Sequence, residues 1–545
     1  MAGVLPARVS EVALGDEPGV VRLPALVKGE LLYARAASFD ALAAAAEAHP
    51  ARPGGGVSSF RFEDRFVVQE PSPGNERARR FLVFPRPDPQ ALVERDAAEL
   101  ARTLYALRFD DVLAYLAALR DALAAAQPAV SAAAALVGGS AFVDPQMLAL
   151  VFDLLPQLFD GASLADAVDR DLGGDGHRGR DYLDGWVEVA AESPRGMTAR
   201  LSDHVLGARA ETRPFRPCVR AIPTRQLHIT AGNSPLLPLL SFLRGLSTKG
   251  ACVVKSPAEA ALASAVVAAA MRAADPDHPI TRHTSLVYWP GGDAEFEDVL
   301  LAPDAFDRIV VWGTADTVRS VRARAPLTKT VALNPRYGVS LVDGRGLDAQ
   351  SADVAARASV DTLVWEQQAC TASLVHYVEG EDADAVAYAR SLAATLARWD
   401  EQRRRPLPRV LQGRIRLLRR GEWLNGTWFE NRVGHELSSA VVYMRGTVDL
   451  ALHPMSRLVV VKRVDRLDDV ASTLTAAVAS AGVHPAAAIP RLRDALAAAG
   501  VSNVFPLGEG ERIYPGIPHD GMRVLSELVN WANSTAFDER SDANG

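Results

Sequence analysis

The feature that most constrains the fold is a regular alternation of short apolar segments with helical segments between Arg225 and Leu333. The expected strands are 226–230, 251–255, 285–289, 308–312 and 330–333. The expected helices between them are 235–246, 258–274, 294–301 and 315–324. Strands that alternate with helices at this spacing form βαβ units, so we predict an α/β fold with a parallel sheet and helices on both faces. Such a sheet binds ligands at the carboxyl ends of its strands.

The residues on either side predict a second α/β region and a helical amino-terminal region. The second region has expected strands at 339–342, 372–378 and 457–464, and expected helices at 348–363, 468–481 and 520–533. The first 190 residues have expected helices at 38–48, 89–107, 110–126 and 144–159, with short strands at 57–62 and 80–84. The predicted division is a helical region at 1–190 packing on the core, an α/β domain at 191–335, a second at 336–535 from which the chain returns to the core, and a disordered tail at 536–545.

Composition restricts the possible classes of function. A chain of 545 residues can hold at least two domains, and 48% hydrophobic with 23% charged residues is typical of a globular protein. The net charge of -7 provides no general field for binding nucleic acid or an anionic membrane. No stretch contains about 20 continuous apolar residues, and the first residues do not resemble a signal peptide. We therefore expect a cytoplasmic protein without a membrane span.

The three cysteines are too few and too widely spaced for a disulfide framework or a metal site. Cys252 lies inside the apolar strand Ala-Cys-Val-Val and is expected to be a packing residue, and Cys218 is expected to be inert. Cys370 lies in the polar turn Glu-Gln-Gln-Ala-Cys-Thr-Ala, between an expected helix and an expected strand. Because a reactive thiol needs partial exposure and thiolate stabilisation, this context leaves nucleophilic catalysis and simple packing both open.

Other candidate residues follow the expected strands of the parallel sheet. Asn233 comes just after the first strand, where its amide can stabilise an oxyanion or cap the next helix. Lys255 ends the second strand, where it can meet a ribose or a phosphate, or remain exposed to solvent. Gly313 and Thr314 repeat this strand-to-helix position. Each signal is weak alone.

A glycine-rich motif at Gly174, Gly176 and Gly179 has the spacing GxGxxG. No apolar strand precedes it, and its neighbours are aspartate, histidine and arginine. The context of a dinucleotide-binding motif is therefore absent, and we interpret the segment as a polar loop.

Taken in order, four motifs resemble the aldehyde dehydrogenase superfamily, and within it the acyl-CoA reductase (LuxC-type) family. They are Ala-Gly-Asn-Ser-Pro at 231–235, Val-Val-Lys-Ser-Pro-Ala-Glu at 253–259, Val-Val-Trp-Gly-Thr-Ala-Asp at 310–316 and Gln-Gln-Ala-Cys-Thr-Ala at 367–372. The tail Pro-Gly-Ile-Pro-His-Asp-Gly-Met at 515–522 is similar to the end of that family. The resemblance implies a Rossmann-like NAD(P)-binding domain at 191–335 and a catalytic thiol domain at 336–535.

The resemblance also implies roles for individual residues. Cys370 would accept the acyl group of a thioester, and Asn233 with the backbone N–H of Cys370 would form the oxyanion hole. Lys255 would contact the adenosine ribose. The other implied cofactor-binding residues are Ser256, Gly313 and Thr314. The implied substrate is acyl-CoA or an acyl-carrier protein, the implied cofactor is NADPH with NADH as the alternative, and a homo-oligomer is left open.

The chain also departs from the aldehyde-oxidising members of the superfamily. Those enzymes carry a glutamate base in a Glu-Leu-Gly-Gly segment, whereas residues 332–338 read Ala-Leu-Asn-Pro-Arg-Tyr-Gly. Without a base to activate water, thioester reduction is favoured over aldehyde oxidation. The alternatives are an aldehyde dehydrogenase that forms acids, and a catalytically silent scaffold with this fold.

Three further residues have two interpretations each. His519 and Asp520 would transfer protons in the site, or Asp520 would cap the last helix. Glu366 would tune the Cys370 thiol, or it would be an exposed acid at a helix end.

Overall fold

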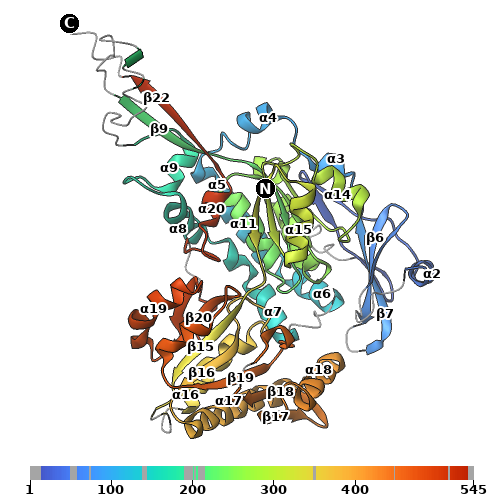
Figure 1. The fold of residues 1–545 in the computed structure, drawn as a ribbon. Coiled ribbons are helices and arrows are strands. Elements are labelled where there is room, and N and C mark those ends of the chain that lie inside the picture. The colour runs from blue at the N-terminus through green and yellow to red at the C-terminus, as the bar shows by residue number, and fades with distance from the viewer. Residues whose placement is uncertain are drawn as a thin grey trace.

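In a computed structural model, the described residues form four β-sheets (Figure 1). The structure describes residues 14–49, 58–72, 75–137, 144–189, 201, 204–205, 215–345, 347, 351–446, 448–512 and 516–537. Two seven-stranded sheets form the upper and lower parts of the molecule in Figure 1, and the segments between them carry the candidate site.

The first seven-stranded sheet has the order β14-β13-β10-β11-β12-β3-β4. Its parallel strands are β10 (Arg225–Ile229), β11 (Ala251–Lys255), β12 (Thr284–Val287), β13 (Arg308–Trp312) and β14 (Lys329–Leu333). Its helices are α11 (Leu237–Ser247), α12 (Ala261–Ala274), α13 (Pro279–Arg282), α14 (Ala294–Leu300) and α15 (Ala315–Arg324), with η3 (Ala258–Ala260) before α12. The predicted parallel sheet is confirmed. The antiparallel edge strands β3 (Ala25–Val27) and β4 (Glu30–Leu32) were not predicted.

The second seven-stranded sheet has the order β17-β18-β19-β16-β15-β20-β21. Its strands are β15 (Tyr337–Asp343), β16 (Ser373–Glu379), β17 (Thr427–Val433), β18 (Glu436–Tyr443), β19 (Leu458–Val464), β20 (Val478–His484) and β21 (Asn503–Pro506). Its helices are α16 (Ser351–Leu363), α17 (Asp382–Arg403), α18 (Arg409–Arg420) and α19 (Ile489–Ala498), with short 3-10 turns η5 (Leu450–Leu452), η6 (Leu467–Thr473) and η7 (Ala486–Ala488).

The helix predicted at 468–481 is wrong, because the short turn η6 is followed by strand β20. β20 lies between β15 and β21, and six of its seven residues are buried. A strand that is buried on both faces has no alternating pattern, so its apolar run cannot be distinguished from a buried helix by periodicity.

The helix predicted at 520–533 is also wrong. Only Val524–Glu527 is helical (α20), and the chain continues as β22 (Asn530–Phe537). β22 pairs antiparallel with β9 (Phe215–Ile222), which also pairs with β8 (Val187–Glu188), and this ribbon projects from the body in Figure 1. The partner strand lies about 300 residues away in the sequence, so no local pattern indicates the pairing. The expected tail from 536 begins inside β22, and residues 538–545 lie outside the described residues.

The amino-terminal region contains the expected helices and also a five-stranded sheet. The sheet has the order β1-β2-β7-β6-β5, formed by β1 (Leu14–Glu17), β2 (Val20–Arg22), β5 (Ser58–Phe62), β6 (Arg65–Ser72) and β7 (Asn75–Pro85). The helices are α2 (Phe39–Glu47), α3 (Pro89–Leu92), α4 (Ala97–Arg102), α5 (Phe109–Ala125), α6 (Gln127–Val137), α7 (Pro145–Leu154), η1 (Leu155–Phe159), α8 (Gly161–Leu172) and α9 (Gly179–Asp184). The helix expected at 89–107 is divided because Asp96 caps α4 by accepting the N–H of Glu99 at 2.9 Å.

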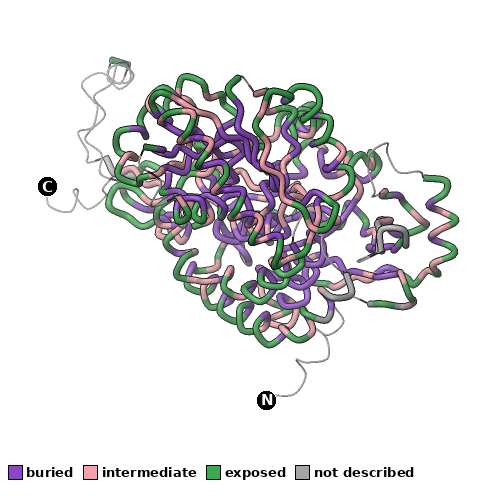
Figure 2. The backbone as a smooth tube through the Cα atoms, turned by 90° about the horizontal axis from the view of Figure 1, so that it is seen from below, coloured by how far each residue is buried: buried purple, intermediate pink, exposed green. Residues whose placement is uncertain are grey.

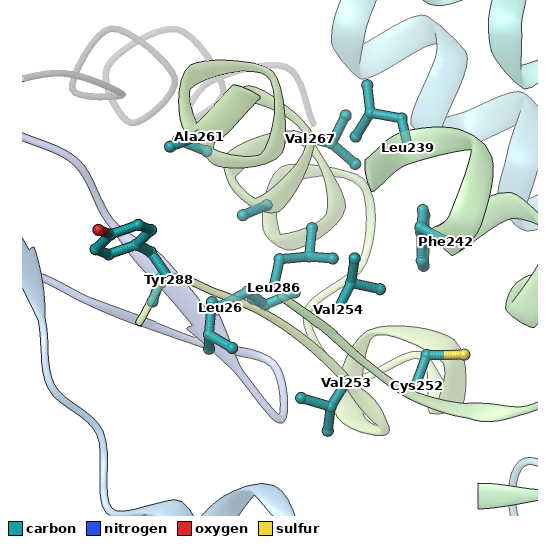
Figure 3. Close-up of a cluster of buried hydrophobic side chains, with 14 of the residues drawn as sticks. Leu26, Leu239, Phe242, Cys252, Val253, Val254, Ala261, Val267, Leu286 and Tyr288 are labelled. Carbon is teal, nitrogen blue, oxygen red and sulfur yellow. The ribbon is translucent and has the colours of Figure 1, made fainter. Parts of the chain in front are cut away.

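The buried residues are concentrated in the interior of the molecule (Figure 2). Figure 3 shows one cluster in which Cys252 lies among Val254, Leu239 and Phe242, so this thiol packs in the core as predicted. Among the described residues, no single helix has the length and apolar composition to cross a membrane. The helices Pro145–Phe159 and Gly161–Leu172 reach that length and composition only when they are taken together, and they are bent by 63°.

Candidate active site

Asn233 is positioned by the loop that leaves the carboxyl end of β10. Its Nδ2 atom donates a hydrogen bond to the backbone carbonyl of Gln368, at 2.9 Å. The residue before α11 is Leu236, and no side chain caps that helix, so Asn233 has no capping role. Its Oδ1 atom is buried and lacks a hydrogen-bond partner within the part of the chain that the structure describes. The amide is therefore held against the backbone two residues before Cys370.

Cys370 lies in a tight turn between α16 and β16, defined here as residues 364–372 and called the thiol turn. Within it Glu366 and Gln367 have positive φ angles of 48° and 61°. The Gln367 side chain donates to the carbonyls of Ser373 (2.9 Å) and Leu458 (2.8 Å) and accepts the N–H of Leu458 (3.0 Å). Three buried hydrogen bonds thus hold the left-handed backbone that leads to the cysteine.

The Cys370 thiol is half-buried, and its environment disfavours the thiolate. Burial raises the pKa of Cys370 to about 11; the charges of Asp520 and Glu511 act in the same direction, and Arg244 acts against them. The backbone carbonyl of Cys370 accepts the hydroxyl of Ser480 at 3.1 Å. Because the thiol is protonated at neutral pH, any attack by its sulfur requires a base.

Glu366 is not the exposed acid that the sequence favoured; its relative accessibility is 4%. Its carboxylate forms ion pairs with Arg405 and with Arg457, the second at 3.6 Å. Burial raises the pKa of Glu366, and the two arginines oppose that shift. The carboxylate therefore anchors the thiol turn to the rest of the second sheet. The structure records no interaction between it and Cys370.

Lys255 lies at the carboxyl end of β11, with Nζ 5.7 Å from the centre of the Trp289 ring. No hydrogen bond or ion pair of this ammonium group is found among the described residues. The carboxylate of Glu259 lies beside Gly232, where an added Cβ would be 2.6 Å from Oε2. These residues gather at the ends of β10 and β11, where the missing side chain of Gly232 lets the Glu259 carboxylate approach the backbone.

The other predicted cofactor-binding residues have different surroundings. The Ser256 hydroxyl is buried and shares a hydrogen bond with the hydroxyl of Ser264 at 2.5 Å. Thr314 is exposed and caps α15 by accepting the N–H of Thr317 at 3.4 Å. Gly313 joins β13 to this helix, and an added Cβ would lie 3.2 Å from Cβ of Thr317. Gly313 and Thr314 therefore stand at a helix amino terminus, whereas the Ser256 side chain points into the protein.

His519 reaches the site from the carboxyl-terminal part of the chain. It pairs with Met522 through two backbone hydrogen bonds of 2.9 and 3.0 Å, which form a tight turn with Asp520 at φ 49°. The His519 ring lies 5.4 Å from the Trp312 ring in an edge-on arrangement. Burial, together with Arg244 and Arg336, lowers the pKa of His519 to about 3, so the imidazole is neutral at neutral pH. Asp520 does not cap α20, which has no side-chain cap.

Sequence reasoning missed Arg244, on α11. Its guanidinium carbon lies 4.9 Å from the centre of the Trp312 ring, and one terminal nitrogen is buried without a hydrogen-bond partner in the described residues. Burial lowers the pKa of Arg244 to about 10, with Asp520, Asp171 and Cys370 acting in the opposite direction. The signal was available, because Arg244 is the only charged residue in an otherwise apolar helix.

Comparisons with known proteins show the family and the fold of the chain. The model of the family described as acyl-CoA reductase (LuxC) matches residues 220–531. A long-chain acyl-protein thioester reductase of Vibrio harveyi is 26% identical over 330 residues, which cover 58% of this chain and 65% of that protein. One from Photorhabdus luminescens is 26% identical over 369 residues, covering 64% and 72%. The chain thus spans about two thirds of the length of these relatives.

Solved structures show the fold. The methylmalonate-semialdehyde dehydrogenase (DddC) of Oceanimonas doudoroffii matches with a TM-score of 0.62 and 12% identity, over 94% of this chain and 97% of that chain. An NADP-dependent glyceraldehyde-3-phosphate dehydrogenase of Bacillus halodurans C-125, complexed with NADP, matches with a TM-score of 0.60 and 14% identity, over 86% and 96%. The chain therefore has the aldehyde dehydrogenase fold that its motifs predicted.

Proposed function

Because the chain belongs to the acyl-CoA reductase (LuxC) family, we propose that it reduces an acyl thioester to an aldehyde through an acyl-Cys370 intermediate. The observation that carries this proposal is the hydrogen bond from Asn233 to the carbonyl of Gln368. It holds an amide donor two residues from the cysteine. An amide nitrogen has two N–H groups, so one remains for the oxyanion that forms when sulfur attacks a carbonyl.

The first step is attack of the Cys370 sulfur on the thioester carbon. A carbon–sulfur bond forms, the bond to the donor thiol breaks, and the thiol proton passes to a base and then to the leaving sulfur. We propose Asp520 as that base, because it follows His519 in the tight turn beside Trp312 and its negative charge acts on the Cys370 thiol. Burial raises the pKa of Asp520, against the pull of Arg336 and Arg244, and a higher pKa makes a better base. His519 belongs to the same turn as Asp520, and its imidazole is neutral at neutral pH.

The cofactor is NAD(P)H, which supplies a hydride to the acyl carbon when it is bound. Lys255 would hold the adenosine ribose, because an unpaired ammonium group can donate hydrogen bonds to hydroxyl oxygens. Gly313 with Thr314 would face the phosphates, because a helix amino terminus favours anions. The residues at these strand ends fit such a group. We propose 191–335 as the cofactor domain, 336–535 as the catalytic domain, and NADPH as the preferred cofactor. Initial rates with NADPH and NADH test the preference.

The acyl donor is proposed to be a thioester bound to a protein, as the names of the relatives suggest, or to CoA, as the family description suggests. The alternative, oxidation of aldehydes to acids, needs an activated water. Residues 332–338 contain no glutamate, and the segment begins with Ala332 where the Glu-Leu-Gly-Gly segment of the oxidising enzymes begins with the base. An alanine cannot activate water, so reduction is favoured.

Mass spectrometry tests the proposal. Acyl-CoA of several chain lengths, added without cofactor, is expected to produce one acyl adduct on Cys370, and NADPH is expected to release it as aldehyde. Cys370→Ala is expected to form neither the adduct nor the aldehyde, and Cys218→Ala serves as the matched thiol control. Full activity in Cys370→Ala, or acid formed from aldehyde and NADP⁺ at a comparable rate, contradicts the proposal.

A further inference from the structure

Glu511 lies outside every motif that the sequence analysis singled out, yet it binds both ends of the thiol turn. One of its carboxylate oxygens accepts the indole N–H of Trp365 at 2.7 Å. The other accepts the hydroxyl of Thr371. Trp365 is five residues before Cys370 and Thr371 is the next residue after it, so a single carboxylate spans the segment that presents the sulfur.

The segment that carries Glu511 is itself fixed to the helix before the thiol turn. Asp361, in the last turn of α16, accepts the backbone N–H groups of Gly508 at 3.1 Å and Gly510 at 3.3 Å. Asp361 is 4% exposed. A Cβ added at Gly510 would lie 2.8 Å from the Phe505 ring and 3.1 Å from Asp361, so only glycine permits this approach.

These bonds close a ring. It runs from α16 through Asp361 to residues 508–511, from Glu511 to Trp365 and Thr371, and back along the chain to α16. A turn held at both ends by charge-assisted hydrogen bonds has little freedom to move, which is the condition for placing a nucleophile against a carbonyl carbon.

We propose that Glu511 is a positioning residue for the nucleophile, clasping the thiol turn through Trp365 and Thr371 and setting the electrostatic environment of the Cys370 sulfur. This inference deepens the proposed function and rests on it for the role of Cys370. The electrostatic effect follows from the negative charge of Glu511, because a carboxylate near a thiol disfavours the thiolate. Glu511 thus contributes to the raised pKa of Cys370.

Two substitutions separate the effects. Glu511→Gln keeps the shape of the clasp, because the amide oxygen accepts from Trp365 and the amide nitrogen donates to the Thr371 hydroxyl, but it removes the charge. Glu511→Ala removes both. Glu509 is the matched control: it lies in the same segment, pairs with Arg512 at 2.7 Å, and has no recorded bond to the thiol turn.

The first measurement is alkylation of Cys370 by iodoacetamide from pH 7 to 9.5, read by mass spectrometry in the whole protein. Glu511→Gln is expected to react about 3 to 10 times faster than wild type at pH 8, because its thiol pKa falls by up to about one unit. Glu509→Gln is expected to match wild type. Equal profiles for Glu511→Gln, Glu509→Gln and wild type overturn the electrostatic part of the inference.

The second experiment measures hydrogen–deuterium exchange over residues 364–372 and the rate of acyl-enzyme formation in the same variants. Glu511→Ala is expected to exchange faster there and to acylate about 10 to 100 times more slowly, whereas Glu511→Gln is expected to stay near wild type in both. Wild-type exchange in Glu511→Ala overturns the clasp. If wild type itself forms no acyl-enzyme, the proposed function fails, but the alkylation and exchange data still decide the role of Glu511.

Discussion

One hydrogen bond, from Asn233 to the Gln368 carbonyl, joins the segment of Asn233 to the thiol turn that carries Cys370. These two regions are stabilised by different forces. Asn233 follows β10, which lies between β11 and β13 in a parallel sheet whose fully buried apolar side chains include Leu227 and Val254. The thiol turn is held by polar groups. Its anchors are the ion pairs of Glu366 with Arg457 and Arg405, the amide of Gln367 and the carboxylate of Glu511.

This difference matches what the two sides of the site must do. An oxyanion donor needs only a fixed position, and apolar burial supplies one that changes little with pH or salt. A nucleophile also needs a controlled pKa, and only nearby charges and hydrogen bonds provide that control. Substitutions on the sheet side should therefore change stability, whereas substitutions on the turn side should also change the chemistry of the thiol.

The largest effect is expected from Arg457→Met on the turn side. Arg457 is 1% exposed and pairs with Asp400 at 3.1 Å and Glu366 at 3.6 Å, so its loss leaves the buried Asp400 carboxylate without its cation and Glu366 with Arg405 alone. We expect urea unfolding to show a loss of about 3–5 kcal/mol. Arg409→Met is the control, because its 3.9 Å pair with Glu436 is exposed and is worth at most about 1 kcal/mol. Equal losses in the two variants would contradict the assignment of Arg457 as an anchor.

The same two regions differ in how far sequence predicts them. The expected strands at 251–255 and 308–312 coincide with β11 and β13, because an apolar run between turn residues is a local signal. The expected helix at 468–481 includes the first residues of β20, because burial on both faces of this strand removes the alternation that marks a strand.

For the candidate site, sequence order indicated Asn233 and Cys370, and the structure brings their segments together. It could not indicate Glu511, which bonds to Trp365 across 146 positions of the chain. Contacts of that kind depend on tertiary packing, which leaves no periodic pattern in the sequence. Arg244 did leave a signal, as the single charge on α11.

Asn233→Ala is the next largest test, and it addresses the chemistry on the sheet side. Loss of an oxyanion donor is expected to lower the acylation rate of Cys370 about 10²–10³-fold. The free energy of unfolding should fall by no more than about 1.5 kcal/mol, because one hydrogen bond to Gln368 is lost. Stopped-flow acylation and urea unfolding on the same preparation provide both numbers. Acylation within threefold of wild type would remove Asn233 from the reaction.

Val254→Ala tests the sheet without touching the reacting groups. Val254 is fully buried in β11, and truncation of its side chain is expected to cost about 1–3 kcal/mol of stability. The pH profile of Cys370 alkylation should be unchanged, because no charge moves. Val410→Ala is the control, since that side chain is 67% exposed. An altered alkylation profile in Val254→Ala would contradict the idea that apolar packing of the sheet and the pKa of the Cys370 thiol are independent.

The smallest effect, and the most direct measure of the turn side, is the pH dependence of the free thiol. Burial raises the pKa of Cys370 to about 11, and Asp520 and Glu511 raise it further against Arg244. Since only the thiolate reacts, labelling by iodoacetamide should increase about tenfold per pH unit from pH 7, and level off near the thiol pKa. Arg244→Gln removes the opposing cation, so its labelling at pH 8 should be about 2 to 5 times slower.

Arg272→Gln is the control for Arg244→Gln, because Arg272 pairs with Glu30 away from the thiol turn. Labelling of wild type that does not change between pH 6 and 9 would contradict the prediction. The sulfur would then already be a thiolate, and the attack on a thioester would need no base. Asp520 would lose its assigned role, and the clasp by Glu511 would act on the position of the nucleophile alone.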